Sequence, residues 1–355
     1  MLSPSSLNEV CDAVRSLPQV RVMGGGTKPA LSANANLSMS KVSGILEYDP
    51  TEYTFTALAG TTLAEVRDVL GKDGLALPFD PPFVESGGTL GGSVAAGLSG
   101  PGRMRYGGLR EFILGAKLVN GEGRVVFGGG KVVKNAAGFD IPKLMVGSLG
   151  RMGVLVELTF KVFPCPATSA TVRIDFPDVA SADRAMTALA MSQAEVSCLD
   201  LEPGRKLWVR MGGLPSATDN RIARVLSIAA GGEATVLKGE DDERTWSDAR
   251  EFRWVPANHG LIKLPIAPSQ VLEVEQLVSQ LGVNVPRRYS VGGNVAWLAW
   301  PTNLPASRLD EICLTLGRPS LTLSGNFDAP WRARQPANAF EQRLFAIFDP
   351  ASKLA

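Results

Sequence analysis

The sequence predicts an α+β protein of two domains, because the two parts of the chain differ in composition and in the order of their elements. Up to Pro166, short apolar runs alternate with glycine-rich stretches; after Pro166, glycine becomes rarer and strands and helices follow in a regular order. The chain has 355 residues, 45% hydrophobic and 20% charged. It is therefore long enough for two cores and has the composition of a soluble globular protein.

The first region begins with a helix over residues 5 to 17, opened by Ser5 or Ser6. A short buried strand at 20 to 23 then runs directly into the glycine loop 24 to 28. A strand that ends in a glycine loop is a frequent architecture of binding sites. We therefore treat this loop as the first candidate site.

Two strands, at 44 to 48 and 53 to 59, lead to Thr62-Leu-Ala-Glu65. This is a capping-box pattern, which predicts a helix from there to about Gly71. The further elements expected in this region are an extended segment at Pro78 to Pro82, a short helix at 90 to 97, a hairpin of 112 to 120 with 124 to 127, a short helix after Asp140, and a strand at 153 to 163.

In the second region, the order strand, helix, strand, strand, helix, strand is predicted twice. The first pass is expected at 171–176, 179–192, 196–202, 206–211, 217–229 and 233–238, and the second at 260–266, 269–281, 284–290, 294–300, 304–316 and 319–323, with a linking helix near 242–251. Each βαββαβ unit predicts a four-stranded antiparallel sheet with both helices on one face. Two such units can join into one larger sheet.

Composition excludes several classes of function. Lys and Arg number 36 against 35 Asp and Glu, so no broad positive surface indicates nucleic acid or an acidic membrane. We find no secretory signal and no long apolar run, which predicts a soluble cytoplasmic protein. The four cysteines are widely spaced and His259 is the only histidine. We therefore expect no metal site, no iron–sulfur cluster in this chain and no histidine metal cluster.

Three glycine-rich segments, 24 to 28, 87 to 92 and 128 to 158, stand out in the first region. A backbone without Cβ atoms can approach a ligand closely, and consecutive amides can form an anion-binding nest. Neither GxGxxG nor GxxxxGK[ST] occurs in them, so a Rossmann site and a P-loop are not supported. Glycines that merely form turns remain the alternative for any single loop, but three such segments favour one large ligand.

Several stretches resemble one known family: LEYDPTEYTFTALAGTTLAEV, PFDPPFVESGGTLGGSVAAGLSGPGR, the long segment from LREFILG to LTFKVFP that includes KVVKNAAGFD, and FDP at 348 to 350. They are similar to the FAD-binding domain of the vanillyl-alcohol-oxidase (PCMH-type) flavoproteins, and most of all to the FAD-binding subunits of bacterial glycolate oxidases. The resemblance implies two α+β subdomains with FAD between them and a cap domain, here the duplicated βαββαβ sheet. The expected domains are 1–166, 167–325, and a C-terminal segment 326–355 that packs back on the FAD domain.

The resemblance also implies which residues bind FAD. The FAD pyrophosphate is expected at Gly24, Gly25, Gly26, Thr27 and Lys28 and at Gly88, Thr89, Leu90, Gly91, Gly92 and Ser93, with Pro78 leading to the second group. The flavin side is expected at Gly97, Ser99, Gly100, Arg105, Tyr106 and Gly107, and the far wall at Gly138, Asp140, Gly147, Gly150, Gly153 and Val154. The first loop lacks the histidine that members with covalent FAD commonly use, so binding should be non-covalent. The chain also departs after FDP, where ASKLA replaces the NPGR-like ending of the family.

Three functions follow from this comparison. The first is an FAD-binding subunit that oxidises glycolate, a 2-hydroxy acid, to glyoxylate beside a catalytic FAD-linked subunit and an iron–sulfur subunit, with any membrane contact made through these partners. The second is a stand-alone FAD-dependent 2-hydroxy-acid dehydrogenase or oxidase, with Arg105, Arg287 or Arg288 on the substrate carboxylate and Tyr106 or His259 assisting proton removal. The third is a non-catalytic assembly subunit with a structural FAD. For His259 and the arginine pair, an ordinary surface role is the simpler interpretation.

Overall fold

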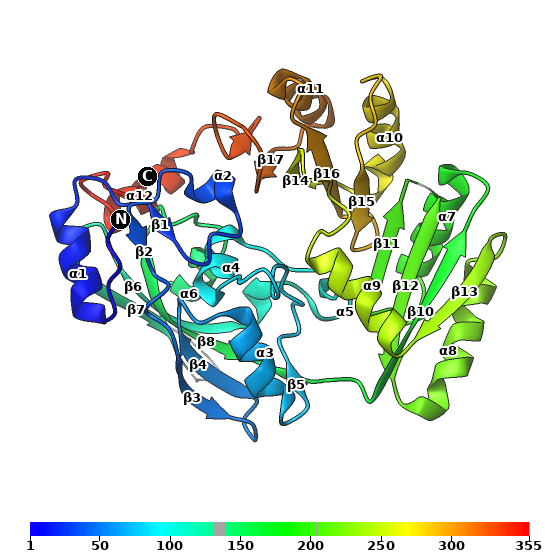
Figure 1. The fold of residues 1–355 in the computed structure, drawn as a ribbon, viewed down its shortest axis with the longest axis horizontal. Helices are drawn as coiled ribbons and strands as arrows, with labels where there is room; N and C mark the ends of the chain where they lie inside the picture. The colour runs from blue at the N-terminus through cyan, green and yellow to red at the C-terminus, as the bar shows by residue number, and fades with distance from the viewer. Residues whose placement is uncertain (131–138, 204, 355) are drawn as a thin grey trace.

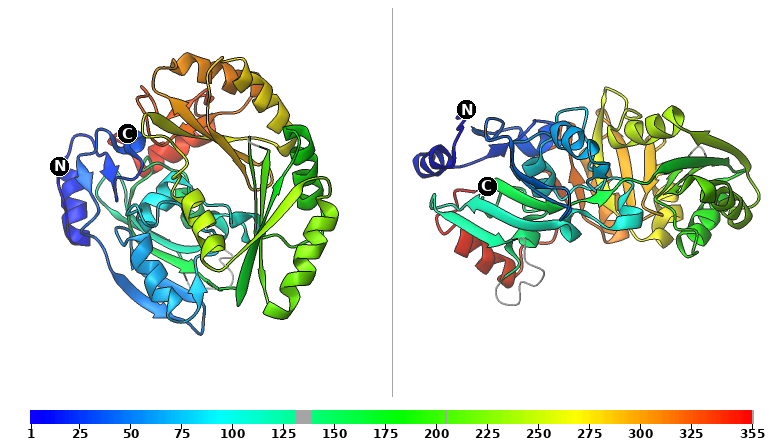
Figure 2. Two further views of the ribbon diagram at one scale, coloured as in Figure 1. Left: turned by 45° about the vertical axis from the view of Figure 1, so that its right-hand side comes forward. Right: turned by 90° about the horizontal axis from the view of Figure 1, so that it is seen from below.

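We describe the protein from a computed structural model that places residues 1–130, 139–203 and 205–354. The expected α+β class is confirmed, because the chain forms two units, each built around its own antiparallel sheet (Figure 1). Figure 2 shows the two units side by side. Over the part of the chain that is described, no helix is both long and apolar enough to cross a lipid bilayer.

The first unit contains a five-stranded sheet in the order β3-β4-β8-β6-β7. Its strands are β3 (Ile45–Asp49), β4 (Thr54–Leu58), β8 (Val154–Lys161), β6 (Ile113–Val119) and β7 (Val125–Gly129). The helices packed against it are α3 (Leu63–Gly71), α4 (Leu90–Ala96), α6 (Ile141–Met145) and α12 (Ala339–Phe348). The expected start of α3 is confirmed, since the Thr62 hydroxyl accepts a hydrogen bond from the Glu65 amide at 3.1 Å.

A small N-terminal subdomain packs on the same sheet. It consists of α1 (Leu7–Ser16), β1 (Val22–Met23), α2 (Pro29–Ser32) and β2 (Leu37–Ser38), with β1 and β2 parallel. The apolar face of α1, with Val10 and Val14, shares one buried cluster with Val119 and Val154 of the five-stranded sheet. The first glycine loop, which leaves β1, therefore lies at the boundary between the two subdomains.

The second unit is a nine-stranded antiparallel sheet in the order β13-β10-β12-β11-β15-β16-β14-β17-β18. Its strands are β10 (Thr168–Asp175), β11 (Cys198–Glu202), β12 (Lys206–Gly213), β13 (Glu233–Lys238), β14 (His259–Pro265), β15 (Arg287–Ser290), β16 (Val295–Pro301), β17 (Ser320–Thr322) and β18 (Trp331–Arg332). The two βαββαβ passes are joined where Leu201 of β11 pairs with Tyr289 of β15. The expected larger sheet is thus present, and we call this unit the cap.

Helices cover the two faces of the cap sheet unequally. One face carries α7 (Val179–Ala190), α8 (Pro215–Ile228), α10 (Val271–Ser279) and α11 (Ala306–Leu316), and the other carries α9 (Glu240–Arg250) (Figure 1). The alternation in β12 explains this, because Leu207 and Val209 join the core under α7 and α8 whereas Trp208 packs near α9. Since α9 lies between the cap sheet and the first unit, it is placed to contact both.

Three features differ from the sequence-based expectations. The segment 78–82 is not extended, because Asp80 has a φ of 51° and the nearby Phe83 a φ of 65°; prolines restrict their own φ but do not prevent such a turn. The helix α12 was not expected at all. The C-terminal segment packs on the first unit through α12, but it also adds β18 to the cap sheet.

The remaining short elements lie near the junction of the two units. They are β5 (Leu75–Ala76), which pairs with β9 (Phe163–Pro164), the single-turn α5 (Arg103–Tyr106), and 3-10 turns at Leu109–Glu111 and Pro268–Gln270. The expected boundary at 166 falls between β9 and β10. The units meet through a mainly apolar cluster in which Phe83 and Leu98 pack with Leu261 and Trp297 of the cap.

Candidate functional site

A pocket with about 1060 Å³ of empty space, counted out to its open mouth, lies beside the first glycine loop. Its walls come from that loop, from α4, from the turn before β8 and from the C-terminal segment at Pro330 and Trp331. The predicted residues that line it are Gly24, Gly25, Gly26, Thr27, Lys28, Thr89, Gly91, Gly92, Gly150 and Gly153. All three glycine-rich segments singled out in the sequence thus contribute to one pocket.

The two glycine loops touch each other directly. A Cβ atom on Gly24 would collide with the Thr89 hydroxyl, and one on Gly25 would collide with the carbonyl oxygen of Gly87. Only glycine allows this approach, because any side chain would push the loops apart. The composition of these loops is therefore required by their mutual packing as well as by a ligand.

The two loops differ in how their amides are used. At the start of α4 the amides of Leu90, Gly91 and Gly92 donate to Thr61, Ala59 and the Thr89 hydroxyl at 3.0, 2.8 and 3.2 Å. In the first loop, the amides of Gly24 to Thr27 donate to no acceptor in the described structure. We expected α4 to supply amides for an anion. The carbonyls of Ala59 and Thr61 and the Thr89 hydroxyl occupy them instead, so the free nest is the first loop.

Lys28 places a buried positive charge beside this nest. Its ammonium donates to the Thr27 hydroxyl at 3.0 Å and lies 5.3 Å from the centre of the Phe83 ring. Burial lowers the pKa of Lys28 to about 8. No carboxylate among the described residues pairs with the ammonium to offset the free-energy cost of burying its charge. A buried cation without an acidic partner next to free amides indicates a site for an anion.

The pocket lining contains another cation and an indole donor. Arg151 lines the pocket with its guanidinium 5.0 Å from the Phe345 ring, and burial lowers its pKa, with a further contribution from nearby Arg334. The Trp331 indole N–H is buried and has no acceptor among the described residues. The rest of the lining is mostly apolar: Val22, Met23, Leu31, Met39, Ala59, Ala95, Ala96, Leu149 and Leu155.

The four candidate catalytic residues lie outside this pocket lining. Arg105 pairs with Glu195 of the cap at 3.2 Å, and the Tyr106 ring packs edge-on against Phe163. His259 contacts the Asn258 side-chain oxygen at 2.9 Å. Arg288 is buried in the cap, and it pairs with Asp200 at 2.6 Å. The companion arginine, Arg287, pairs with Glu275.

The other predicted cofactor residues are not among the residues that line the pocket. They are Pro78, Gly88, Leu90, Ser93, Gly97, Ser99, Gly100, Gly107, Asp140, Gly147 and Val154. Ser93 and Val154 are buried in the walls, and Asp140 caps α6 and pairs with Lys143 at 2.9 Å. Gly138 lies outside the described residues, as does the rest of 131–138. The role of these residues in binding stays a prediction.

The features of the pocket fit a ligand with a phosphate group and flat rings. The free amides and Lys28 suit the phosphate, and the apolar walls with the Trp331 donor suit the rings. Sequence reasoning missed Arg151, Trp331 and the apolar residues of the lining. For Arg151 the neighbouring glycines were a usable signal, whereas Trp331 reaches the pocket only through the fold.

Comparison with known proteins identifies the family. An FAD binding domain model matches residues 1–129. The chain is 34% identical to glycolate oxidase subunit GlcE of Escherichia coli (strain K12), over 98% of this chain and 94% of that protein. It is also 31% identical to a D-2-hydroxyglutarate dehydrogenase of Xanthomonas citri pv. viticola, over 54% of this chain and 42% of the relative.

A solved structure supports the fold. The chain superposes on an alkyldihydroxyacetonephosphate synthase with a TM-score of 0.74 and 16% identity, over 99% of this chain and 75% of the other. At that identity the likeness concerns the fold alone. Together with the match along nearly the whole sequence, it leads to one conclusion: the chain belongs to the family of glycolate oxidase subunit GlcE and contains an FAD binding domain.

Proposed function

We propose that this protein is the FAD-binding subunit of an oxidoreductase complex that oxidises glycolate to glyoxylate. In this proposal it works with a catalytic FAD-linked subunit and an iron–sulfur subunit. The observation that carries it is the pocket, in which the free amides of the first glycine loop lie beside the buried, unpaired Lys28. The family relationship adds the substrate class, since the related subunit is named for glycolate oxidase.

The chain's own residues divide the binding of FAD between them. The first loop and Lys28 hold the pyrophosphate, and the Trp331 N–H offers a donor to a ring. Leu31, Leu149 and their apolar neighbours exclude water from the rings. When bound, FAD supplies the two-electron acceptor for converting a 2-hydroxy acid to a 2-oxo acid.

The pocket favours a subunit that relies on partners for its chemistry. Oxidation of a 2-hydroxy acid needs a base for the hydroxyl proton. The titratable groups in the described lining are Lys28 and Arg151, and neither a carboxylate nor an imidazole is among them. The arginines proposed to grip a substrate are held by Glu195, Asp200 and Glu275. Because the proposal assigns Lys28 to the pyrophosphate and Arg151 stays protonated, it assigns the base and the exit for electrons to the partner subunits.

An anaerobic visible spectrum tests the proposal. The purified chain is loaded with FAD, and glycolate and D-lactate are added first to the chain alone and then to the chain with the candidate partner subunits. We expect yellow protein whose own flavin absorbance, obtained by subtracting the spectrum of the partners measured without this chain, bleaches with glycolate only when the partners are present.

Each other outcome contradicts a part of the proposal. Rapid bleaching of the chain alone would mean a stand-alone 2-hydroxy-acid dehydrogenase. Absorbance that stays unchanged even with active partners would mean a structural FAD. A colourless chain that takes up no FAD would overturn the cofactor assignment itself.

A further inference from the structure

The segment before the second glycine loop is held from the cap side. Arg250, the last residue of α9, forms an ion pair with Asp80 at 2.6 Å, and its carbonyl accepts the amide of Phe83 at 3.2 Å. Asp80 also accepts the amide of Gly102 at 2.9 Å. One residue of the cap, Arg250, thus meets the turn at residues 80–83 through both its side chain and its backbone.

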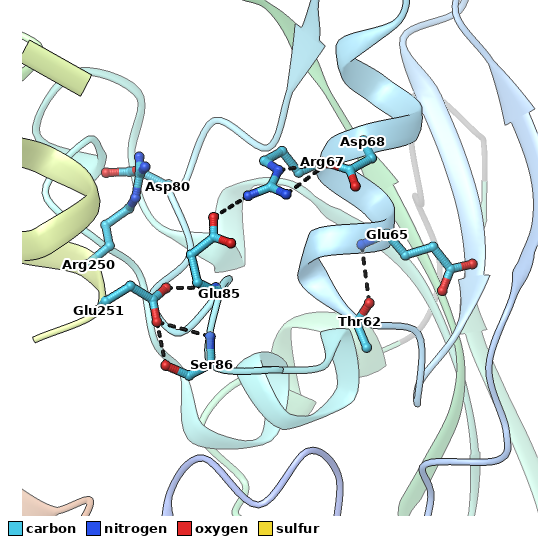
Figure 3. A network of polar contacts seen from close by, with 9 residues as sticks. All are labelled: Thr62, Glu65, Arg67, Asp68, Asp80, Glu85, Ser86, Arg250 and Glu251. Atoms are coloured by element: carbon cyan, nitrogen blue, oxygen red, sulfur yellow. Dashed lines mark hydrogen bonds and ion pairs between the residues drawn. The ribbon is translucent and has the colours of Figure 1, made fainter. Parts of the chain in front are cut away.

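Glu251, the next residue, continues this contact toward the loop. Its carboxylate accepts the amide of Glu85 at 2.9 Å and the amide of Ser86 at 3.1 Å, and it also accepts the Ser86 hydroxyl (Figure 3). Glu85 in turn pairs with Arg67 of α3. One carboxylate of the cap therefore takes three donors from the segment that enters the glycine loop.

The segment needs such support because its backbone is strained. Asp80 and Phe83 adopt left-handed conformations with φ of 51° and 65°. For residues other than glycine, such conformations are unfavourable and persist only where surrounding contacts impose them. Arg250 contacts both of these residues, and Glu251 contacts the two residues that follow Val84.

Residues 80–86 position part of the pocket wall. Ser86 is followed by Gly87, whose carbonyl oxygen lies against Gly25 of the first loop. Phe83 supplies the ring below the Lys28 ammonium, and its carbonyl accepts the amide of Gly88 at 2.7 Å. A displacement at residues 83–86 would thus move both the neighbour of the first loop and the neighbour of Lys28.

We propose that Arg250 and Glu251 are positioning residues for FAD: helix α9 of the cap holds residues 80–86 so that the two glycine loops keep their spacing. The proposal rests on the FAD site of the proposed function. It makes the docking of the cap a condition for tight FAD binding, although α9 does not line the pocket. By linkage, bound FAD must also stabilise the contact between α9 and this segment.

The first test compares Glu251→Ala, Glu251→Gln and the control Arg253→Ala in the full chain, with FAD affinity and the melting temperature of the FAD-free protein as readouts. The control breaks the exposed 2.6 Å pair of Arg253 with Asp248 at the same helix end. We expect Glu251→Ala to weaken FAD binding by about tenfold, as for lost hydrogen bonds to a charged group. Glu251→Gln keeps one acceptor oxygen and should recover part of the affinity, and the control should stay within about twofold.

The second test needs no variant at Glu251, so a failure of that variant to fold does not remove the evidence. Hydrogen exchange of the wild-type chain is measured with and without FAD. We expect slower exchange in residues 80–92 and also in residues 244–253. If only the first segment gains protection, or if Glu251→Ala melts earlier yet binds FAD as tightly as the wild type, the positioning role is wrong. If the wild-type chain binds no FAD, the proposed function fails together with it.

Discussion

Lys28 combines features that make it sensitive to pH. Burial lowers its pKa to about 8 in the free protein, so it is charged below that pH and increasingly neutral above it. An anion beside the ammonium favours the charged form and raises the pKa again. Binding of FAD above pH 8 must therefore take up a proton.

We expect the affinity for FAD to fall as the pH rises above about 8, because Lys28 must be protonated before it can pair with the pyrophosphate. Lys28→Met should weaken binding by about 10- to 100-fold at pH 7, from the loss of about 1.5–3 kcal/mol for a hydrogen bond to a charged group. Titrations of FAD into the FAD-free wild type and into Lys28→Met, from pH 6.5 to 9.5, measure the pH dependence of the affinity and the effect of the substitution. If the affinity of Lys28→Met for FAD falls with pH as steeply as that of the wild type, the proton is taken up by another group.

Gly25 shows how little room the loops leave. Gly25→Ala should abolish FAD binding and lower the melting temperature, because the new methyl group meets the carbonyl oxygen of Gly87. Gly71→Ala is the matched control, since a Cβ there has no neighbour within 4 Å. It should leave FAD binding intact. Thermal melts and FAD titrations compare both variants with the wild type. Equal losses of FAD affinity and of melting temperature in the two variants would contradict the role given to Gly25.

At the scale of elements, one buried polar cluster of the cap depends on helix α9. Asp242 in the first turn of α9 is fully buried, and it accepts hydrogen bonds from Ser169 and Thr171 at 2.6 and 2.5 Å. It also pairs with Arg210 at 2.7 Å. Helix α9, which contacts residues 80–86, is thus fixed to the cap sheet by the Asp242 carboxylate.

We expect Asp242→Asn to destabilise the protein by about 3–5 kcal/mol, the usual cost of removing one partner of a buried ion pair. The neighbouring Asp241→Asn breaks only the exposed pair with Arg244 and should cost about 0.5 kcal/mol or less. Urea unfolding of both variants gives the two values. Similar midpoints would show that the Asp242 pair contributes little to stability.

Local sequence patterns predicted those elements that local contacts determine. The helices α1, α3 and α4 and the β6–β7 hairpin lie where their caps, glycines and apolar spacing indicated. The helix α12 was missed although Asn338 and Glu341 form a capping box, a readable signal that preceded an apolar run. The turn at Asp80 could not be predicted, because Arg250 imposes it from a distant part of the sequence.

The same distinction applies to the site. Glycine composition located the two loops, but which loop keeps free amides depends on where the carbonyls of residues 59–61 lie. Trp331 and Arg151 reach the pocket through packing between segments far apart in sequence. Candidate catalytic residues chosen by type, such as Arg288, turned out to be held by acidic partners inside the cap.

For the whole molecule, the distribution of tryptophan offers a probe of how the parts meet. The chain has 6 tryptophans, all between residues 208 and 331 and therefore outside the matched FAD binding domain. Trp331 nevertheless lines the pocket. The emission of the second half of the chain should report a ligand bound largely by the first half.

We expect FAD to quench the tryptophan emission, and Trp331→Phe to remove a clear part of that quenching while the protein still binds FAD. The control is Trp300→Phe, because the Trp300 indole is buried on the helix-covered face of the cap and donates to the Leu304 carbonyl at 3.1 Å. Emission spectra during FAD titration compare the two variants. Equal loss of quenching in both would place Trp331 away from the bound rings.

The span of the pocket lining has a consequence for the order of events during synthesis. Val22 and Met23 leave the ribosome some three hundred residues before Pro330 and Trp331, which belong to the same pocket lining. A nascent chain that has presented only residues 1–129 carries the glycine loops without the turn before β8 and without Pro330 and Trp331. The complete lining of the pocket therefore forms only after residue 331 has been added, and we expect a chain that ends before Pro330 to bind FAD more weakly.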